Sequence, residues 1–487
     1  MPDDTGINDG LIFTEKKNQY TETYLKNIGT ADEKAYKRYE HIIKTDNNLN
    51  RQLVSFQANK SLSAYRWYKY KEAFSCDLVR YMLTEYHIPK GIVFDPFAGS
   101  GTTLFASSET GYNSEGIELL PLGQQIVKSR ITANKLGHNE ISRIAFWKDS
   151  LPWKNFKFSE KINSLRITAG AYPEESEKSI SQYLAAIKEE KEDVREILLF
   201  ALLCILESVS YTRKDGQYLR WDYRAGRRIG KKIFNKGIIY PFEEAIVSKL
   251  DEILNDSNSK NIQCGLFPDV QEKNVPVGNI RLYHGSCLNI LPNLENANYQ
   301  AVITSPPYCN RYDYTRTYAL EHAILGIQEQ ELIDLRQKML SCTVENREKD
   351  LLQFNKTWSK AIASCENNSL LQLIIGYLEY RKKNKDLNNN GIPRMVKGYF
   401  YEMACVIQEC HRILKNGGIM FMVNDNVRYA GAGVSADLIL SEIAEHIGFA
   451  VENILVLPNG KGNSSQQMGI HGREVLRKCV YVWRKSN

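Results

Sequence analysis

Two short strings in the sequence have residue types and a spacing that could do chemistry. The first, FDPFAGSGTT, covers residues 94–103, between a short apolar run and a helical pattern. Gly99 and Gly101 allow a tight turn and a close approach to a ligand, and free amides at a helix start favour a carboxylate or phosphate. The next expected strand, NSEGIE, ends in Glu118, where an acid can accept hydrogen bonds from ribose hydroxyls. These residues predict a cradle for an adenosine-bearing ligand with a charged tail.

The glycine turn differs from two common nucleotide-binding loops. No Lys precedes its Ser or Thr as in a Walker loop, and GSGTTL has no third Gly of the dinucleotide fingerprint. Taken alone, the same residues also fit a helix-capping turn in which Glu118 is a solvated strand end.

The second string, TSPPY, covers residues 304–308 and follows a run, Tyr299 to Ile303, that is apolar enough for a buried strand. Two consecutive prolines end the strand in a stiff backbone that has no amide donors for the sheet. The string alone also fits a strand terminator with a packed Tyr.

Together, DPFAGSGTT and TSPPY resemble the motifs of the S-adenosylmethionine-dependent DNA amino-methyltransferases, most closely the N4-cytosine type. The resemblance implies an α/β fold with a Rossmann-like, doubly wound sheet that binds S-adenosylmethionine (AdoMet), with Glu118 on the ribose. It implies further cofactor-binding residues in the glycine turn and in the upstream segment KEAFS: Asp95, Pro96, Phe97, Gly99, Gly101, Thr102, Phe74 and Ser75. Phe74 fits a plain core position equally well.

One cofactor contact departs from the family pattern. In IRLYHGSCLNIL, Ser286 stands where many relatives carry the Asp that would contact the adenine amine. Ser286 is therefore an expected cofactor residue with an open role, and Asp149 is an alternative for that contact.

The resemblance also gives the prolines a chemical purpose. The amine of cytosine or adenine is a poor nucleophile, so an enzyme must hold hydrogen-bond acceptors against its N–H groups. Ser305 and the Pro306 carbonyl can be those acceptors, and Pro306 and Pro307 hold them rigidly. Tyr308 offers a ring on which a flipped base can stack. Cys309 is expected to pack only, because attack by an amine needs no covalent intermediate.

A basic and aromatic segment lies between the two strings. It runs from Tyr211 to Lys232, and its position resembles that of a target-recognition region. Basic groups can neutralise phosphates, and Arg can reach guanine edges. The expected DNA contacts are Arg213, Lys214, Arg220, Trp221 and Arg224, together with Arg311 and Arg316 after TSPPY. A solvated basic hairpin with its aromatics in the core fits the same composition.

The chain pattern predicts four parts. They are an N-terminal helical extension at 1–60, the AdoMet-binding part at 61–150, a largely helical inserted target-recognition region at 151–275, and the catalytic part at 276–487, with a helical insertion at about 325–395.

Composition excludes several other classes of protein. The chain has 487 residues, 43% of them hydrophobic, and a net charge of +6, so an anionic partner is permitted but not required. Its ten Cys residues form no CxxC pair, so neither a metal site nor a disulfide framework is expected. No targeting segment or membrane-spanning run is evident, and a cytoplasmic location is expected.

The function expected from these features is site-specific methylation of double-stranded DNA from AdoMet, most closely at cytosine N4, because Ser opens the PPY string. Adenine N6 methylation is the first alternative. An RNA guanine-amine methyltransferase and a non-catalytic DNA-binding subunit are the others. A cognate restriction endonuclease, as in a restriction-modification system, is a possible partner, and the oligomeric state is open.

Overall fold

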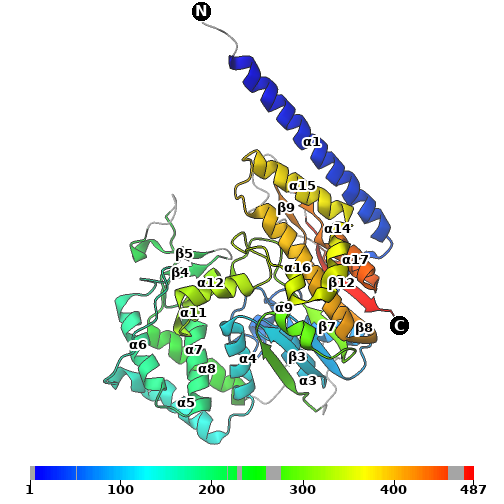
Figure 1. Cartoon of the computed structure of the whole chain (residues 1–487). Coiled ribbons are helices and arrows are strands. Elements are labelled where there is room, and N and C mark those ends of the chain that lie inside the picture. Colours follow the sequence, from blue (N-terminus) through cyan, green and yellow to red (C-terminus); the bar gives the residue numbers. More distant parts are fainter. Residues whose placement is uncertain are drawn as a thin grey trace, which may run out of the picture. The chain divides into compact units, whose positions relative to one another are not determined.

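The computed structural model describes residues 6–50, 52–215, 218–227, 233–258, 276–458 and 476–486. The chain divides into two compact units (Figure 1). Unit 1 comprises Met1–Asn50, Leu288–Asn310 and Leu340–Asn487, and unit 2 comprises Arg51–Cys287 and Arg311–Met339. Of the predicted recognition segment, residues 216–217 and 228–232 lie outside the described residues.

Unit 2 contains the part of the sheet that follows the predicted nucleotide-binding pattern. Its strands β2 (Ile92–Asp95), β3 (Asn113–Glu118) and β6 (Ile280–His284) are parallel, in the order β2-β3-β6. The helix α3 (Thr102–Glu109) connects β2 to β3 and packs against both strands. Because the three strands run in the same direction, the residues that follow Asp95, Glu118 and His284 lie at one edge of this sheet.

The middle of unit 2 is largely helical, as the sequence predicts. Its core gathers large aromatic side chains: Trp147 stacks on Trp153 with 5.8 Å between ring centroids, and Tyr183 meets Trp153 edge-on at 5.1 Å. A short antiparallel hairpin, β4 (Thr212–Lys214) with β5 (Leu219–Trp221), follows these helices in the chain. The helices of unit 2 besides α3 are α2 (Cys76–Glu85), α4 (Pro121–Ala133), α5 (His138–Ser150), α6 (Glu174–Ile187), α7 (Glu192–Ile205), α8 (Phe242–Asn258), α10 (Tyr314–Thr317), α11 (Ala319–Ile324) and α12 (Glu329–Lys338).

Unit 1 carries a mixed set of strands in the order β1-β11-β12-β8-β7. β7 runs parallel to β8, β8 and β11 are each antiparallel to β12, and β1 is parallel to β11. The two closing strands, β11 and β12, therefore form an antiparallel pair. The bounds are β1 (Ile43–Thr45), β7 (Tyr299–Thr304), β8 (Leu414–Asp425), β11 (Phe449–Val456) and β12 (Lys478–Lys485), with a separate hairpin of β9 (Val427–Tyr429) and β10 (Ala432–Val434).

The helices of unit 1 include a long N-terminal one. In α1 (Gly6–Tyr39), Tyr20 and Tyr24 pack their rings against Tyr377 and Tyr380 of α15, and the two helices lie side by side in Figure 1. The other helices are α13 (Leu351–Phe354), α14 (Ser359–Glu366), α15 (Ser369–Lys383), α16 (Ile392–Ile413) and α17 (Ala436–Ile447), while α9 (Cys287–Ile290) spans the boundary between the units. The mixed α/β architecture confirms the Rossmann-like fold expected from the sequence.

Candidate functional site

The glycine turn after β2 is joined to the end of β3 by two hydrogen bonds. The backbone amide of Gly99 donates to Glu118 Oε2 at 2.6 Å, and the amide of Leu120 donates to Glu118 Oε1 at 2.7 Å. A carboxylate oxygen has two lone pairs, so each oxygen can accept a further hydrogen bond. The buried carboxylate is thus held in one orientation and keeps acceptor capacity for a ligand.

Burial changes the acidity of this carboxyl group. It raises the pKa of Glu118 to about 7, an effect that the amides of Leu120 and Gly99 oppose and the nearby charge of Asp95 supports. Hydroxyl donors from a ribose would favour the ionised form. These properties fit the ribose of an adenosine cofactor.

The turn itself depends on glycine. Gly101 has a φ of +79° and caps α3, and a Cβ there would lie 2.8 Å from Val127 Cγ2. Gly99 has a φ of +54°. The buried Asp95 accepts a hydrogen bond from the amide of Phe97 at 3.0 Å, which fixes the entry to the turn. Pro96 and Thr102 are also buried, whereas Phe97 is half-exposed.

Ser286 lies next to the cradle. The amide of Gly285 donates to the carbonyl of Glu118 at 3.0 Å, so the turn after β6 adjoins the turn after β3. Ser286 Oγ donates to the carbonyl of Lys338 at 3.0 Å. The alternative residue Asp149 is on α5, exposed, with a carboxylate 3.4 Å from Lys148 Nζ.

Phe74 and Ser75 have structural contacts. Phe74 is buried, and its carbonyl accepts a hydrogen bond from Asn59 Nδ2 at 2.9 Å. Ser75 caps α2, where its hydroxyl accepts from the amide of Leu78 at 3.1 Å. The structure therefore gives both residues a local role in starting α2.

A group of tyrosines that the motifs did not indicate adjoins the glycine turn. A Cβ built on Gly99 would lie 3.4 Å from the ring of Tyr70, which stacks on Tyr318. Tyr318 and Tyr312 both donate hydrogen bonds to the carboxylate of Glu72. The only sequence signal was the density of aromatics in YRWYKYKEAFS and CNRYDYTRTY, which does not say which rings meet.

TSPPY lies in unit 1, at the end of β7. Ser305 Oγ is 3.0 Å from Tyr308 Oη and donates to the carbonyl of Val423 at 3.3 Å. The serine hydroxyl is thereby tied both to its own motif and to β8. Pro306 is buried, while Ser305 and Tyr308 are half-buried.

An ion pair adjoins Tyr308. Lys478 Nζ lies 5.6 Å from the centre of the Tyr308 ring and 3.5 Å from Asp425 Oδ1. Although burial disfavours the ammonium ion, Tyr308 and Asp425 hold the pKa of Lys478 above its usual value. Cys309 is buried and burial raises its pKa, which agrees with a packing role.

The β4–β5 hairpin sorts the predicted DNA contacts into exposed and buried groups. Arg213 and Arg220 face each other across the hairpin and are exposed. Lys214 is buried, and its Nζ donates to Glu321 Oε1 at 2.5 Å and to the Tyr68 hydroxyl at 3.0 Å. Trp221 is buried as well. Lys214 and Trp221 therefore anchor the hairpin within unit 2.

The other predicted DNA contacts are partly engaged. Arg224 bonds Asp222 at 2.7 Å, and these bonds lower the pKa of Asp222 to about 2. Arg316 Nε lies 3.4 Å from Asp313 Oδ2. Arg311 is half-buried, with a φ of +66°.

Comparisons with known proteins identify the family. The model of the N6/N4 methyltransferase family, described as DNA methylase, matches residues 9–128, which include the glycine turn and Glu118 but not TSPPY. The type II methyltransferase M.AvaI of Nostoc sp. is 53% identical over 471 residues, 96% of each chain, and the protein of the same name from Anabaena variabilis has the same values. The type II methyltransferase M.BsoBI of Geobacillus stearothermophilus is 39% identical over 484 residues, which cover 93% of this chain and 91% of that one.

This chain belongs to the type II DNA methyltransferases. Membership implies AdoMet as the methyl donor, and the cofactor predicted from the sequence agrees. In this methyltransferase, Glu118, Asp95 and the glycine turn would hold it. When bound, AdoMet supplies a methyl group on a sulfonium centre that an amine can attack.

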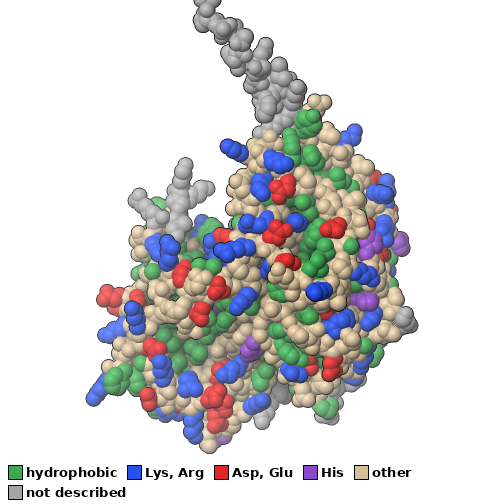
Figure 2. Space-filling model, viewed as in Figure 1, with side chains coloured by type: hydrophobic (Ala, Val, Ile, Leu, Met, Phe, Trp, Pro, Cys, Tyr) green, Lys and Arg blue, Asp and Glu red, His purple; other side chains and the backbone are tan. Residues whose placement is uncertain are grey.

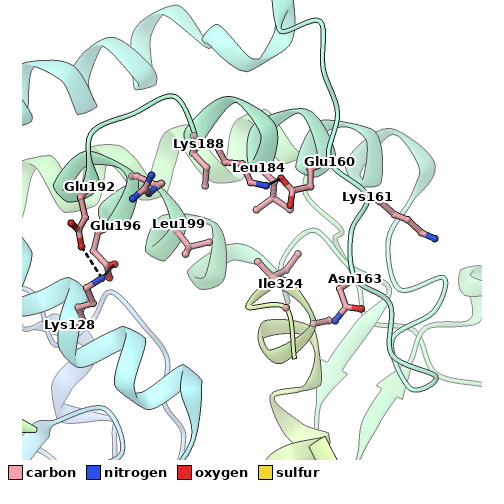
Figure 3. A pocket seen from close by; sticks show the side chains of 14 residues that line it. Lys128, Glu160, Lys161, Asn163, Leu184, Lys188, Glu192, Glu196, Leu199 and Ile324 are labelled. Atoms are coloured by element: carbon pink, nitrogen blue, oxygen red, sulfur yellow. Dashed lines mark ion pairs between the residues drawn. The ribbon is translucent and has the colours of Figure 1, made fainter. Parts of the chain in front are cut away.

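A separate cavity of the methyltransferase, of 280 Å³, lies among residues of α4, α6, α7 and α11 (Figure 3). Its charges largely cancel, because Lys128 Nζ lies 3.0 Å from Glu196 Oε2 and Lys188 pairs with Glu160. We therefore assign the cavity no ligand.

Two further expectations concern absence. Within the described residues of the methyltransferase, no group of three or more His, Cys, Asp or Glu is placed to hold a metal ion. No helix among the described residues has the length and apolar character needed to cross a bilayer.

Proposed function

We propose that this chain methylates the exocyclic N4 amine of cytosine within a specific sequence of double-stranded DNA. The observation that carries the proposal is the position of Ser305 at the end of β7, where its hydroxyl is held by Tyr308 and the Val423 carbonyl. A serine oxygen held in this way can accept a hydrogen bond from an amino group with little reorganisation.

The assigned roles divide between the two units. In unit 1, Ser305 and the Pro306 carbonyl accept N–H hydrogens of the target amine, which keeps electron density on its nitrogen. The Tyr308 ring stacks on the flipped base, an interaction that contributes about 1–3 kcal/mol. In unit 2, the cradle of Asp95, Gly99 and Glu118 binds the cofactor.

DNA recognition is assigned to the hairpin of unit 2. The exposed Arg213 and Arg220 can meet phosphates or base edges, and the exposed ring of Tyr218 lies next to β5. Arg220 also lies 3.9 Å from Asp215 and over the ring of Phe234, contacts that DNA would have to replace or share. Figure 2 shows Lys and Arg intermingled with Asp and Glu on the face in view, without one dominant basic area. The proposal of DNA binding therefore rests on the exposed Arg side chains of the hairpin and not on the net charge of the chain.

The experiment is incubation of the purified protein with labelled AdoMet and mixed-sequence duplex DNA or total RNA, followed by digestion to nucleosides and mass spectrometry. The expected product is N4-methylcytosine in DNA. N6-methyladenine would overturn the assignment of the base, and label in RNA alone would overturn the substrate. No label, together with no AdoMet binding in calorimetry, would favour a non-catalytic DNA-binding subunit.

The type II designation of the relatives also supports a cognate restriction endonuclease as partner of this chain. DNA methylated by the chain is expected to resist that endonuclease at the methylated site. Equal cleavage of methylated and unmethylated DNA would contradict the pairing.

A further inference from the structure

A half-buried carboxylate with two tyrosine donors lies in unit 2, within the segment KEAFS from which Phe74 and Ser75 were expected to contact the cofactor. Glu72 accepts hydrogen bonds from the hydroxyls of Tyr312 and Tyr318. Burial raises the pKa of Glu72, while the two hydroxyls oppose that rise. In the part of the chain that the structure describes, no Lys or Arg forms a direct ion pair with this carboxylate, although the charge of the neighbouring Lys71 also opposes the rise in its pKa.

This carboxylate adjoins the cofactor cradle. Tyr70 stacks almost parallel on Tyr318, at 11° and 5.1 Å between centroids, and its ring borders Gly99. The charges of Glu118 and Glu72 both raise the pKa of Tyr70, after burial. The Tyr70 ring therefore lies close to both carboxylates, one at the end of β3 and one in the tyrosine cluster.

A half-buried carboxylate without a directly paired cation is stabilised in its ionised form by a nearby positive charge, which a cationic ligand can supply. AdoMet carries a sulfonium centre bonded to the ribose side of the molecule. The product left after methyl transfer, S-adenosylhomocysteine, has a neutral thioether there instead. The sulfur atom is bonded to the ribose in both molecules. If Glu118 binds the ribose, the sulfur therefore lies close to the glycine turn.

We propose that Glu72, held by Tyr312 and Tyr318, is the counter-ion for the positive charge of the methyl donor, so that the enzyme binds the donor more tightly than the demethylated product. The inference rests on the proposed function in one respect, namely that the glycine turn of unit 2 binds AdoMet. Tyrosine ring faces beside the carboxylate add favourable contact with a cation. The cluster thus limits product inhibition.

The test is calorimetric titration of the full-length protein with AdoMet, with S-adenosylhomocysteine and with sinefungin, an analogue that carries a protonated amine near the sulfonium position. Glu72→Gln keeps the size of the side chain and removes its charge. This variant is expected to bind AdoMet and sinefungin about tenfold more weakly, equivalent to about 1.4 kcal/mol of binding free energy. Its affinity for S-adenosylhomocysteine is expected to change less than twofold.

One variant serves as a control, and two more extend the test. Glu402→Gln removes a buried carboxylate that bonds Ser341 and Lys349 in unit 1, and it should leave the ratio of the two affinities unchanged. Tyr312→Phe and Tyr318→Phe keep the rings but remove the donors. Because these hydroxyls oppose the rise in the pKa of Glu72, their loss should weaken binding of AdoMet more than binding of S-adenosylhomocysteine, and the difference should shrink as the pH is raised.

An equal loss of affinity for all three ligands in Glu72→Gln would overturn the inference and leave the cofactor site standing. Unchanged ratios in all three cluster variants would also overturn it. Failure of the wild-type protein to bind either AdoMet or S-adenosylhomocysteine would instead refute the proposed function on which it rests.

Discussion

The carboxylate of Glu118 accepts a 2.6 Å hydrogen bond from the amide of Gly99, which joins the end of β3 to the turn after β2. This bond makes the cofactor cradle a joint product of two neighbouring parallel strands. Its geometry depends on the glycine backbone and on a carboxyl group whose pKa burial raises to about 7.

Cofactor binding should depend on pH through Glu118. Ribose hydroxyls that donate to the carboxylate stabilise its ionised form. Cofactor binding therefore lowers the pKa of Glu118 and releases a proton from its carboxyl group. Affinity for both AdoMet and S-adenosylhomocysteine should therefore rise about tenfold from about pH 6 to about pH 8 and level off above it. Calorimetry in buffers of different ionisation enthalpy measures the released proton. Glu118→Gln should bind weakly at every pH, and persistence of the pH dependence in that variant would rule Glu118 out as its source.

Gly101→Ala should damage the cradle directly. The added Cβ would lie 2.8 Å from Val127 Cγ2, in a backbone conformation that disfavours side chains. We expect a loss of about 1–3 kcal/mol in the free energy of unfolding and a clear fall in AdoMet affinity. The matched control is Gly376→Ala in α15, where the new Cβ meets nothing within 4 Å. The higher helix propensity of Ala should raise the free energy of unfolding of this variant by about 0.5–1 kcal/mol. Urea denaturation of both variants compares the two sites.

The basic residues of the hairpin should separate into two classes. The side chains of Lys214 and Glu321 are 6% and 0% exposed, so Lys214→Met leaves a buried carboxylate alone and should cost about 3–5 kcal/mol of stability. Arg220→Ala should leave the melting temperature almost unchanged, weaken DNA binding and lower the salt slope of that binding by about one. AdoMet affinity should stay the same in Arg220→Ala. If Arg213→Ala and Arg220→Ala both leave DNA affinity unchanged, the hairpin does not belong to the DNA interface.

Tyr308 should matter for the base and not for the cofactor. Tyr308→Ala removes the stacking ring and should cost about 1–3 kcal/mol of flipped-base binding, which 2-aminopurine fluorescence at the target position reports. Tyr308→Phe keeps the ring and loses the contacts of its hydroxyl with Ser305 and Lys478, so base binding should be largely retained while turnover falls. Asp95→Ala should instead weaken AdoMet binding. Equal cofactor loss in the Tyr308 and Asp95 variants would contradict this division of roles.

The elements nearest the motifs were predictable because their sequence signal is local. GIVFD is a short apolar run and NSEGIE is the next expected strand along the chain, and they form β2 and β3, which end at Asp95 and Glu118. β1 was not predictable: Ile43–Thr45 has no alternation of its own, and it is a strand because β11 supplies its hydrogen-bonding partner. The N-terminal stretch therefore reads as purely helical from the sequence.

The site shows the same limit. Glu118 and the glycine turn are 19 residues apart and belong to one strand-turn-helix-strand unit, so their association could be predicted. Glu72 and Tyr312 are 240 residues apart, and only the tertiary fold brings them together. Lys214 looked like its basic neighbours in the sequence, yet its partner Glu321 is 107 residues away.

The chain alternates between its two units, and this connectivity has a consequence for synthesis. β1, at residues 43–45, pairs with β11, at residues 449–456. β7, at residues 299–304, pairs with β8, at residues 414–425, which follows the helical insertion in the chain. Unit 1 therefore cannot complete its sheet until nearly the whole polypeptide has left the ribosome, and its early segments must wait in an unpaired state. Such long-range pairing is slow to form and exposes strand edges meanwhile. The yield of folded protein in cells should accordingly rise at low temperature and with added chaperones. Truncated translation products should aggregate and should not accumulate as folded fragments.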